Sequence, residues 1–138
     1  MAARASEWLV VAEENAAAGE HLRARERLRA SASRFYYAAY QAAHALLFTT
    51  PLKGAVPAKG NWDHGPLINA VKESALRHLS FDEPRAEQLR RRLAAARDAR
   101  VYADYGPDVQ FEERSLDDAQ KAATQFIALA HRHGAIGQ

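Results

Sequence analysis

The chain of 138 residues contains no cysteine. This absence excludes disulfides, thiolate metal sites and a cysteine nucleophile, and it favours a reducing compartment. No apolar run is long enough to span a bilayer, and acidic residues between Met1 and Ala18 interrupt any signal-peptide pattern. We therefore expect a cytoplasmic protein without a membrane segment. The length predicts one domain over residues 1–138.

Lysine is scarce, because only Lys53, Lys59, Lys72 and Lys121 are lysine among 19 basic residues. Most of the arginines lie in two clusters: Arg23, Arg25, Arg27, Arg29 and Arg34, then Arg85, Arg90, Arg91, Arg92, Arg97 and Arg100. Guanidinium groups match the geometry of phosphate. Charge runs on helices are more often solvated faces, and the net charge of only +2 does not require a polyanionic partner.

Alternating strand-like patterns are absent, and alanine and leucine, both strong helix formers, dominate the chain. Apolar spacings of three and four residues predict helices over about 4–18, 20–48, 66–79, 84–105 and 116–133. We expect Gly19 to stop or kink the first helix, and Ser115 with Asp118 to form a capping box. The sequence thus predicts an all-α, up-and-down bundle of about five helices, with a long loop over 49–63 and a tail that frays after residue 133.

Polar residues continue an apolar stripe on the fourth predicted helix. Leu89, Leu93, Arg97, Arg100 and Asp104 follow one another at steps of three and four, so they share one side. If this side faces a neighbouring helix, the last three form a polar pocket at one end of the bundle. The alternative is a surface pair of Arg100 and Asp104, worth ~0.3–0.5 kcal/mol.

The second predicted helix adds further candidates on one side, namely Arg34, Tyr37 and His44. A histidine in an apolar stretch is usually a hydrogen-bonded core residue, so a catalytic His44 and a structural His44 both stay open. His64 precedes the third helix, where it could cap that helix or line the site. No glycine-rich phosphate loop and no His-Glu-x-x-His pattern occurs, so we expect neither a cofactor nor a metal site.

Several segments together resemble the HEPN family, and most closely its small stand-alone bacterial and archaeal branch. The run from Ser33 to Leu47 is similar to the long second helix of that family. The break at Gly19, the His64-Gly65 pair and the last helix with Ala122, Phe126 and Ile127 fit the same pattern. Arg97-x-x-Arg100-x-x-Ala103-Asp104-Tyr105-Gly106 resembles the Ala-Asp-Tyr signature of the branch.

The resemblance implies a helical bundle, usually a homodimer with a polar site near the dimer interface. Many members are metal-independent ribonucleases whose motif is an arginine followed about four to six residues later by a histidine. Several are toxins paired with a nucleotidyltransferase antitoxin. Here Tyr102, Asp104 and Tyr105 occupy the place where the motif histidine would follow Arg97 or Arg100. An ionised aspartate accepts a proton but does not donate one.

Three hypotheses follow. The first is a nucleotide- or RNA-binding module that works with a nucleotidyltransferase-like partner. In it arginines hold phosphates, and Tyr37, Tyr102 and Tyr105 contact bases or act as modification acceptors. The second is a metal-independent endoribonuclease with Arg97, Arg100 and Asp104 in its catalytic site. An arginine stabilises charge on the scissile phosphate, and His44 or His64 replaces the missing histidine. The third is a helical scaffold without a ligand, whose function is its dimer face.

Overall fold

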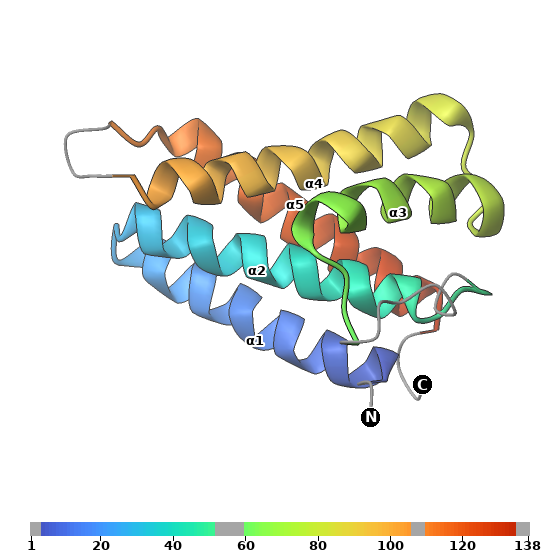
Figure 1. Ribbon diagram of the computed structural model, residues 1–138. Helices are drawn as coiled ribbons and strands as arrows, with labels where there is room; N and C mark the ends of the chain where they lie inside the picture. The colour runs from blue at the N-terminus through green and yellow to red at the C-terminus, as the bar shows by residue number, and fades with distance from the viewer. Residues whose placement is uncertain (1–3, 52–59, 106–109, 135–138) are drawn as a thin grey trace.

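The computed structural model describes residues 4–51, 60–105 and 110–134. These residues form five α-helices: α1 (Ala5–Ala24), α2 (Leu28–Leu47), α3 (His64–His78), α4 (Glu83–Ala103) and α5 (Glu113–Arg132). The predicted all-α bundle is confirmed (Figure 1). Within the described part, no helix is both long and apolar enough to cross a membrane.

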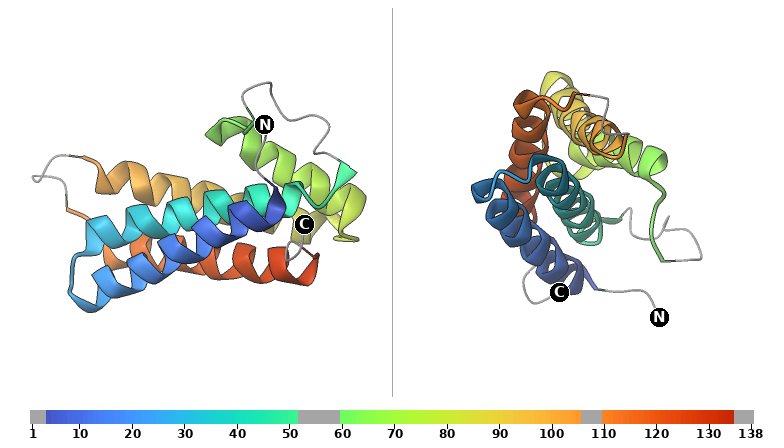
Figure 2. Two further views of the ribbon diagram at one scale, coloured as in Figure 1. Left: turned by 90° about the horizontal axis from the view of Figure 1, so that it is seen from below. Right: turned by 90° about the vertical axis from the view of Figure 1, so that its left-hand side faces the viewer.

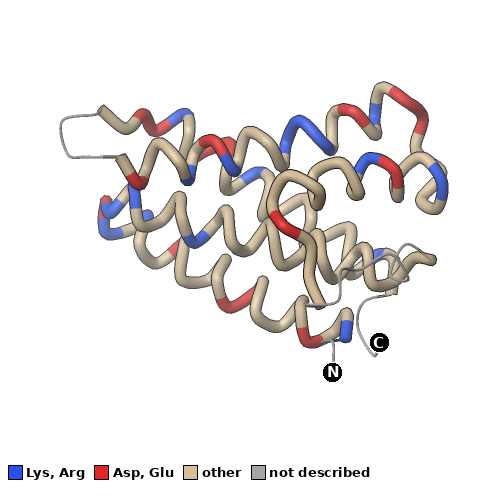
Figure 3. Tube along the Cα trace, viewed as in Figure 1, with Lys and Arg blue, Asp and Glu red and all other residues tan. Residues whose placement is uncertain are grey.

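Helix α2 lies at the centre and packs against each of the other four helices (Figures 1 and 2). Its sequence explains this position, because no charged residue occurs from Phe35 to Leu47. Most side chains of this stretch are buried, including Phe35, Tyr36, Leu46 and Leu47. In Figure 3 this half of α2 lacks charged segments, whereas its first turns carry arginines. A helix that is apolar on most sides is stable only inside a bundle.

The boundary between the first two helices differs from the prediction. Gly19 neither stops nor kinks α1 but lies buried within it, and α1 continues to Ala24. The break falls at residues 25–27, where Glu26 adopts a left-handed φ of 60°. Glycine costs about 1 kcal/mol in a helix interior, but here it allows close packing. A Cβ on Gly19 would lie 2.9 Å from the Phe35 ring, and the Ser31 hydroxyl donates to the Gly19 carbonyl at 2.7 Å.

The start of the last helix also corrects a prediction. Ser115 and Asp118 do not form a capping box, because α5 begins earlier, with Glu112 at its N-cap and no side-chain cap bond there. The start of α4 follows its proline: Pro84 lies in the first turn, and the Asp82 carboxylate accepts from the Arg85 amide at 3.0 Å. Gly106 and Pro107, most of the predicted loop over 49–63, and the tail from residue 135 lie outside the described residues.

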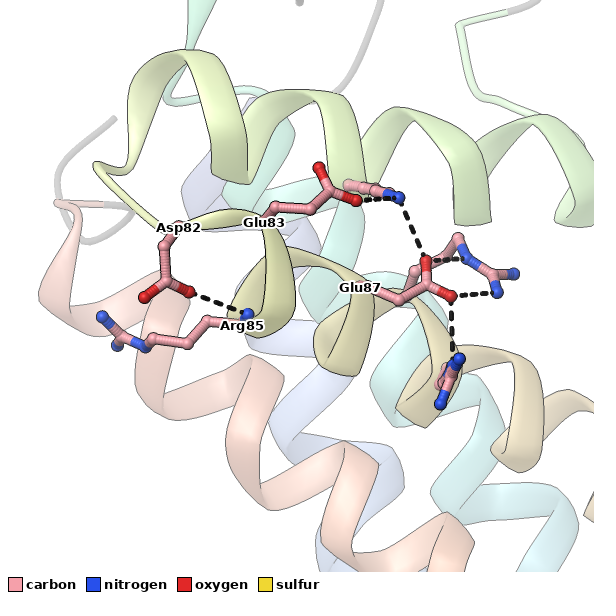
Figure 4. A network of polar contacts seen from close by, with 7 residues as sticks. Asp82, Glu83, Arg85 and Glu87 are labelled. Carbon is pink, nitrogen blue, oxygen red and sulfur yellow. Dashed lines mark hydrogen bonds and ion pairs between the residues drawn. The ribbon is translucent and has the colours of Figure 1, made fainter.

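An ion network joins α3 to α4 near their connection (Figure 4). The Lys72 ammonium of α3 lies 2.7 Å from the Glu83 carboxylate and 3.2 Å from that of Glu87. Glu87 also binds Arg90 at 2.6 Å and Arg91 at 3.1 Å. The hydrogen bond from Arg90, followed by those from Lys72 and Arg91, holds the pKa of Glu87 far below its usual value. This network links α3 to the first turns of α4.

Candidate functional site

A groove runs between the first half of α2 and the end of α4. It has a volume of about 490 Å³ and is lined by Arg29, Ala30, Ser33, Arg34 and Tyr37 from α2, with Ala103 and Asp104 from α4. The steps of three and four residues along α2 place these side chains on one face. The structure therefore brings together three residues predicted from the sequence, Arg34, Tyr37 and Asp104; we call this hollow the α2–α4 groove.

Arg100 joins the groove through two contacts. Its guanidinium carbon lies 5.4 Å from the centroid of the Tyr37 ring, a distance at which a cation is attracted to the ring. Its Nε lies 3.4 Å from the Asp104 carboxylate. The alignment of that ion pair does not make a hydrogen bond, so the buried Nε has no hydrogen-bond partner within the described residues. Arg100 is thus held between Tyr37 and Asp104, with one buried donor that makes no hydrogen bond within the described residues.

Arg29, which also lines the groove, binds the carbonyl groups at the end of α4. Its Nη1 donates to the carbonyls of Tyr102, Ala103 and Tyr105 at 3.3, 3.2 and 3.1 Å. The last carbonyls of a helix have no partner within the helix, and a basic side chain stabilises them by hydrogen bonding and by charge. Arg29 therefore holds the end of α4 against α2 and shapes the groove.

Arg34 is exposed and lies toward α1. Its Nη1 donates to the Asn15 side-chain oxygen at 3.2 Å. The Asn15 amide in turn contacts the Gln41 amide at 2.8 Å. A neutral partner leaves the charge of Arg34 uncompensated by this contact, so Arg34 keeps its attraction for an anion. Two polar side chains from α1 and α2 thereby orient the exposed arginine.

The start of α3 carries a second group of predicted residues beside the groove. The Nδ1 atom of His64 is hydrogen bonded to the Tyr36 hydroxyl, and its ring centroid lies 4.6 Å from that of Tyr40. Burial, opposed by the charges of Arg97 and Arg100, raises the pKa of Tyr36 well above its usual value. Tyr36 therefore stays protonated, and its hydroxyl donates to Nδ1 in one tautomer of His64 and accepts from it in the other.

Arg97 lies on the same side of the bundle as His64. A Cβ added to Gly65 would be 3.8 Å from Arg97 Nη1, so the guanidinium reaches the first turn of α3. Because Arg97 and Arg100 both act on Tyr36, the two arginines and the Tyr36–His64 pair share one neighbourhood. The junction of α2, α3 and α4 thus places arginines near a half-buried histidine from another helix.

His44 does not reach the surface at the junction of α2, α3 and α4. It is fully buried, and its ring stacks on Trp8 with centroids 4.4 Å apart. Its Nδ1 is bonded to the Tyr40 carbonyl at 3.0 Å, and its Nε2 accepts from the Trp62 amide at 3.0 Å. Burial, the largest cause, lowers the pKa of His44 to about 4. With both nitrogens engaged, His44 is a structural link between α2 and the segment before α3.

Tyr102 and Tyr105 lie at the end of α4 outside the residues that line the groove. Both are half exposed, and their rings meet edge to face with centroids 5.8 Å apart. They are accessible for stacking, but the groove does not include their rings. Among residues 4–51, 60–105 and 110–134, no group of three histidine or carboxylate side chains is placed to hold a metal ion.

Sequence reasoning missed two residues that shape the site. Arg29 was noted only as a member of an arginine cluster, although it precedes Tyr37 by eight residues and so shares its helix face. Asn15 gave no comparable signal, since its contact with Arg34 joins two helices.

Comparison with known proteins gives one positive result. No curated protein and no solved structure matches the chain. The family model for the HEPN domain matches residues 5–133, a range that includes all five described helices, the α2–α4 groove and the start of α3. The chain therefore belongs to the HEPN domain family.

Proposed function

We propose that this protein is a cytoplasmic nucleotide- or RNA-binding module whose binding surface is the α2–α4 groove. The observation that carries the proposal is that Tyr37 lines the groove together with Arg34, while the Arg100 guanidinium lies over the Tyr37 ring. Arginine forks bind phosphate oxygens, and the donor at Arg100 Nε has no hydrogen-bond partner within the described helices. A tyrosine at the groove supplies a face for a base, as in single-strand binding sites.

The carboxylate in the groove limits what binds there. Asp104 lies beside Arg100 and is exposed, so it repels phosphates that approach the end of α4. A phosphate is best placed between Arg34 and Arg100, with the base toward Tyr37. This arrangement suits one or two nucleotides of a single strand better than the regular backbone of a duplex.

The test is to measure the binding constant for a labelled single-stranded RNA by fluorescence anisotropy at a series of salt concentrations. Each phosphate contact contributes about 0.7 to the slope of log K against log salt for single strands. An Arg34→Ala, Arg100→Ala double variant should bind more weakly and lose about 1.4 from that slope. Arg77→Ala is the matched control, because Arg77 is an exposed arginine on the far part of α3 and pairs with Glu73.

The two single variants, Arg34→Ala and Arg100→Ala, complete the comparison. If Arg77→Ala weakens RNA binding as much as either of them does, binding depends on the overall charge of the protein and not on the groove. No binding at low salt would leave the scaffold hypothesis, in which the helices provide only a protein interface.

A second candidate function is a metal-independent endoribonuclease at the α2–α3–α4 junction. It is favoured by the approach of Arg97 to the first turn of α3, where His64 is held by Tyr36. Arg97 would stabilise negative charge that develops on the scissile phosphate, and His64 would transfer the proton in place of the missing motif histidine. His44 is the weaker candidate, since both of its nitrogens are engaged.

Cleavage of single-stranded RNA in excess chelator tests this second function. The parent should cleave, and His64→Ala and Arg97→Ala should abolish cleavage, whereas His78→Ala, at the exposed end of α3, should not. Cleavage that persists in His64→Ala would exclude His64 as the motif histidine.

The proposal includes a homodimer and a nucleotidyltransferase-like partner, as in toxin–antitoxin pairs. Membership of the HEPN family supports both parts. Light scattering after size exclusion tests the dimer, and a monomer at all concentrations would contradict it.

A further inference from the structure

A second hollow lies where α4 packs against α5. Its main part has a volume of about 450 Å³ and includes Arg92 from α4 with Lys121, Thr124 and Gln125 from α5. It continues into a smaller part of about 240 Å³ that shares Arg92 and Lys121 and adds Asp118. We call this hollow the α4–α5 groove. None of its residues lines the α2–α4 groove.

Two buried polar atoms in the α4–α5 groove have no hydrogen-bond partner in the described part of the chain. They are Nε of Arg92, a donor, and Oε1 of Gln125, an acceptor. Buried polar groups are nearly always hydrogen bonded, because an unpaired one loses its bonds to water without replacement. A donor and an acceptor left unpaired in the same hollow indicate a ligand that carries both kinds of group.

The charges of the groove are also incompletely paired. Among the described residues, no carboxylate lies within 4.0 Å of the cationic atoms of Arg92 or Lys121. Asp117 also lines the main part of the groove, but its carboxylate is bound to Arg23 at 2.6 Å. Asp118 remains as one carboxylate in the smaller part of the groove. Two unpaired cations and one carboxylate attract an anionic group and offer an acceptor beside it.

We propose that the α4–α5 groove binds a small hydroxylated molecule that carries a phosphate ester, such as a sugar phosphate. Arg92 and Lys121 hold the phosphate, since a guanidinium and an ammonium are its usual partners in proteins. Gln125 Oε1 and the Asp118 carboxylate accept hydrogen bonds from the hydroxyl groups. The carboxylate of Asp118 repels a second phosphate, so an RNA backbone is disfavoured. The site is independent of the function proposed for the α2–α4 groove.

The test is a titration of the isotope-labelled protein with ribose 5-phosphate, followed by NMR of the backbone amides. We expect shifts in residues 88–95 and 117–125 and none around Tyr37. Arg92→Gln and Lys121→Gln should each weaken binding about tenfold or more, the value of one charge-assisted hydrogen bond. Arg77→Gln on α3 is the control and should leave the affinity unchanged. Lys121 is exposed, so its variant keeps the test valid if Arg92→Gln fails to fold.

Inorganic phosphate and ribose form the two comparison arms. Phosphate alone should bind about tenfold or more weakly, because it leaves Gln125 unpaired, and ribose alone should not bind. Equal affinity for phosphate and ribose 5-phosphate would indicate an adventitious ion only and overturn the proposal. Shifts confined to the α2–α4 groove, or unchanged affinity in both variants, would overturn it as well. RNA binding by the α2–α4 groove can succeed or fail without changing any of these outcomes.

Discussion

The buried His44 makes the stability of the bundle depend on pH. Its pKa falls from 6.5 to about 4 on folding because burial disfavours the charged ring. Above pH 6.5 the ring is neutral in both states, so His44 has no effect on the pH dependence. As the pH falls below 6.5, the unfolded chain takes up a proton that the folded chain refuses, and the folded state loses stability until the pH reaches about 4.

The size of this loss follows from the two pKa values. Linkage gives about 2.5 kcal/mol at a pH of about 4.5. The measurement is the free energy of unfolding in urea near pH 7.5 and near pH 4.5, for the parent and for His44→Gln. The variant is less stable at both values, but it should lose about 2–3 kcal/mol less than the parent between them. Every other group is common to the parent and the variant, so the difference between the two proteins reports on position 44.

An equal loss in the parent and in His44→Gln would refute the reasoning. It would mean that the ring is hydrated enough to be protonated in the folded state, or that His44 leaves its place between Tyr40 and Trp62 without unfolding the bundle. Either result would return His44 to the candidates for proton transfer.

Three further predictions concern packing, the segment before α3 and the ion network. Gly19→Val should destabilise the bundle by about 2–3 kcal/mol in urea unfolding, because the new side chain overlaps a buried ring; Gly65→Ala, with its nearest contact at 3.8 Å, should cost nothing. Tyr40→Phe should cost about 1 kcal/mol, since its hydroxyl donates to the Trp62 carbonyl at 2.8 Å; no change in urea unfolding would show that water replaces it. Glu87→Gln should lower Tm near pH 7, and the difference should vanish in acid, where protonation of the parent Glu87 removes the same stabilisation.

Much of the fold could be predicted from the sequence, because the signals are local. An uncharged stretch on α2 predicts burial on most sides, and the structure confirms it. The boundary at Gly19 was wrong because glycine weakens a helix locally, whereas the contact with Phe35 that keeps it there joins two helices. The predicted capping box at Ser115 was wrong for a related reason. A pattern of two residues does not determine at which turn a helix begins, and α5 begins before Ser115.

In the candidate site, too, contacts within one helix could be predicted, whereas contacts between helices could not. The contact of Arg100 with Asp104 follows from a step of four residues and was foreseen. Spacing also put His44 on one side of α2 with Arg34 and Tyr37, but spacing says nothing about which elements cover that side. Near the end of α2 the indole of Trp8 stacks on His44, which is fully buried.

The alanines of α2 determine which mutations this bundle can accept. Ala38, Ala39, Ala42, Ala43 and Ala45 are all fully buried, so neighbouring backbones approach the central helix where larger residues would hold them apart. Enlarging any of these positions meets atoms that belong to other helices and cannot move alone. Substitutions to larger residues in the core therefore require compensating changes on two helices, whereas the exposed arginines can be substituted one at a time.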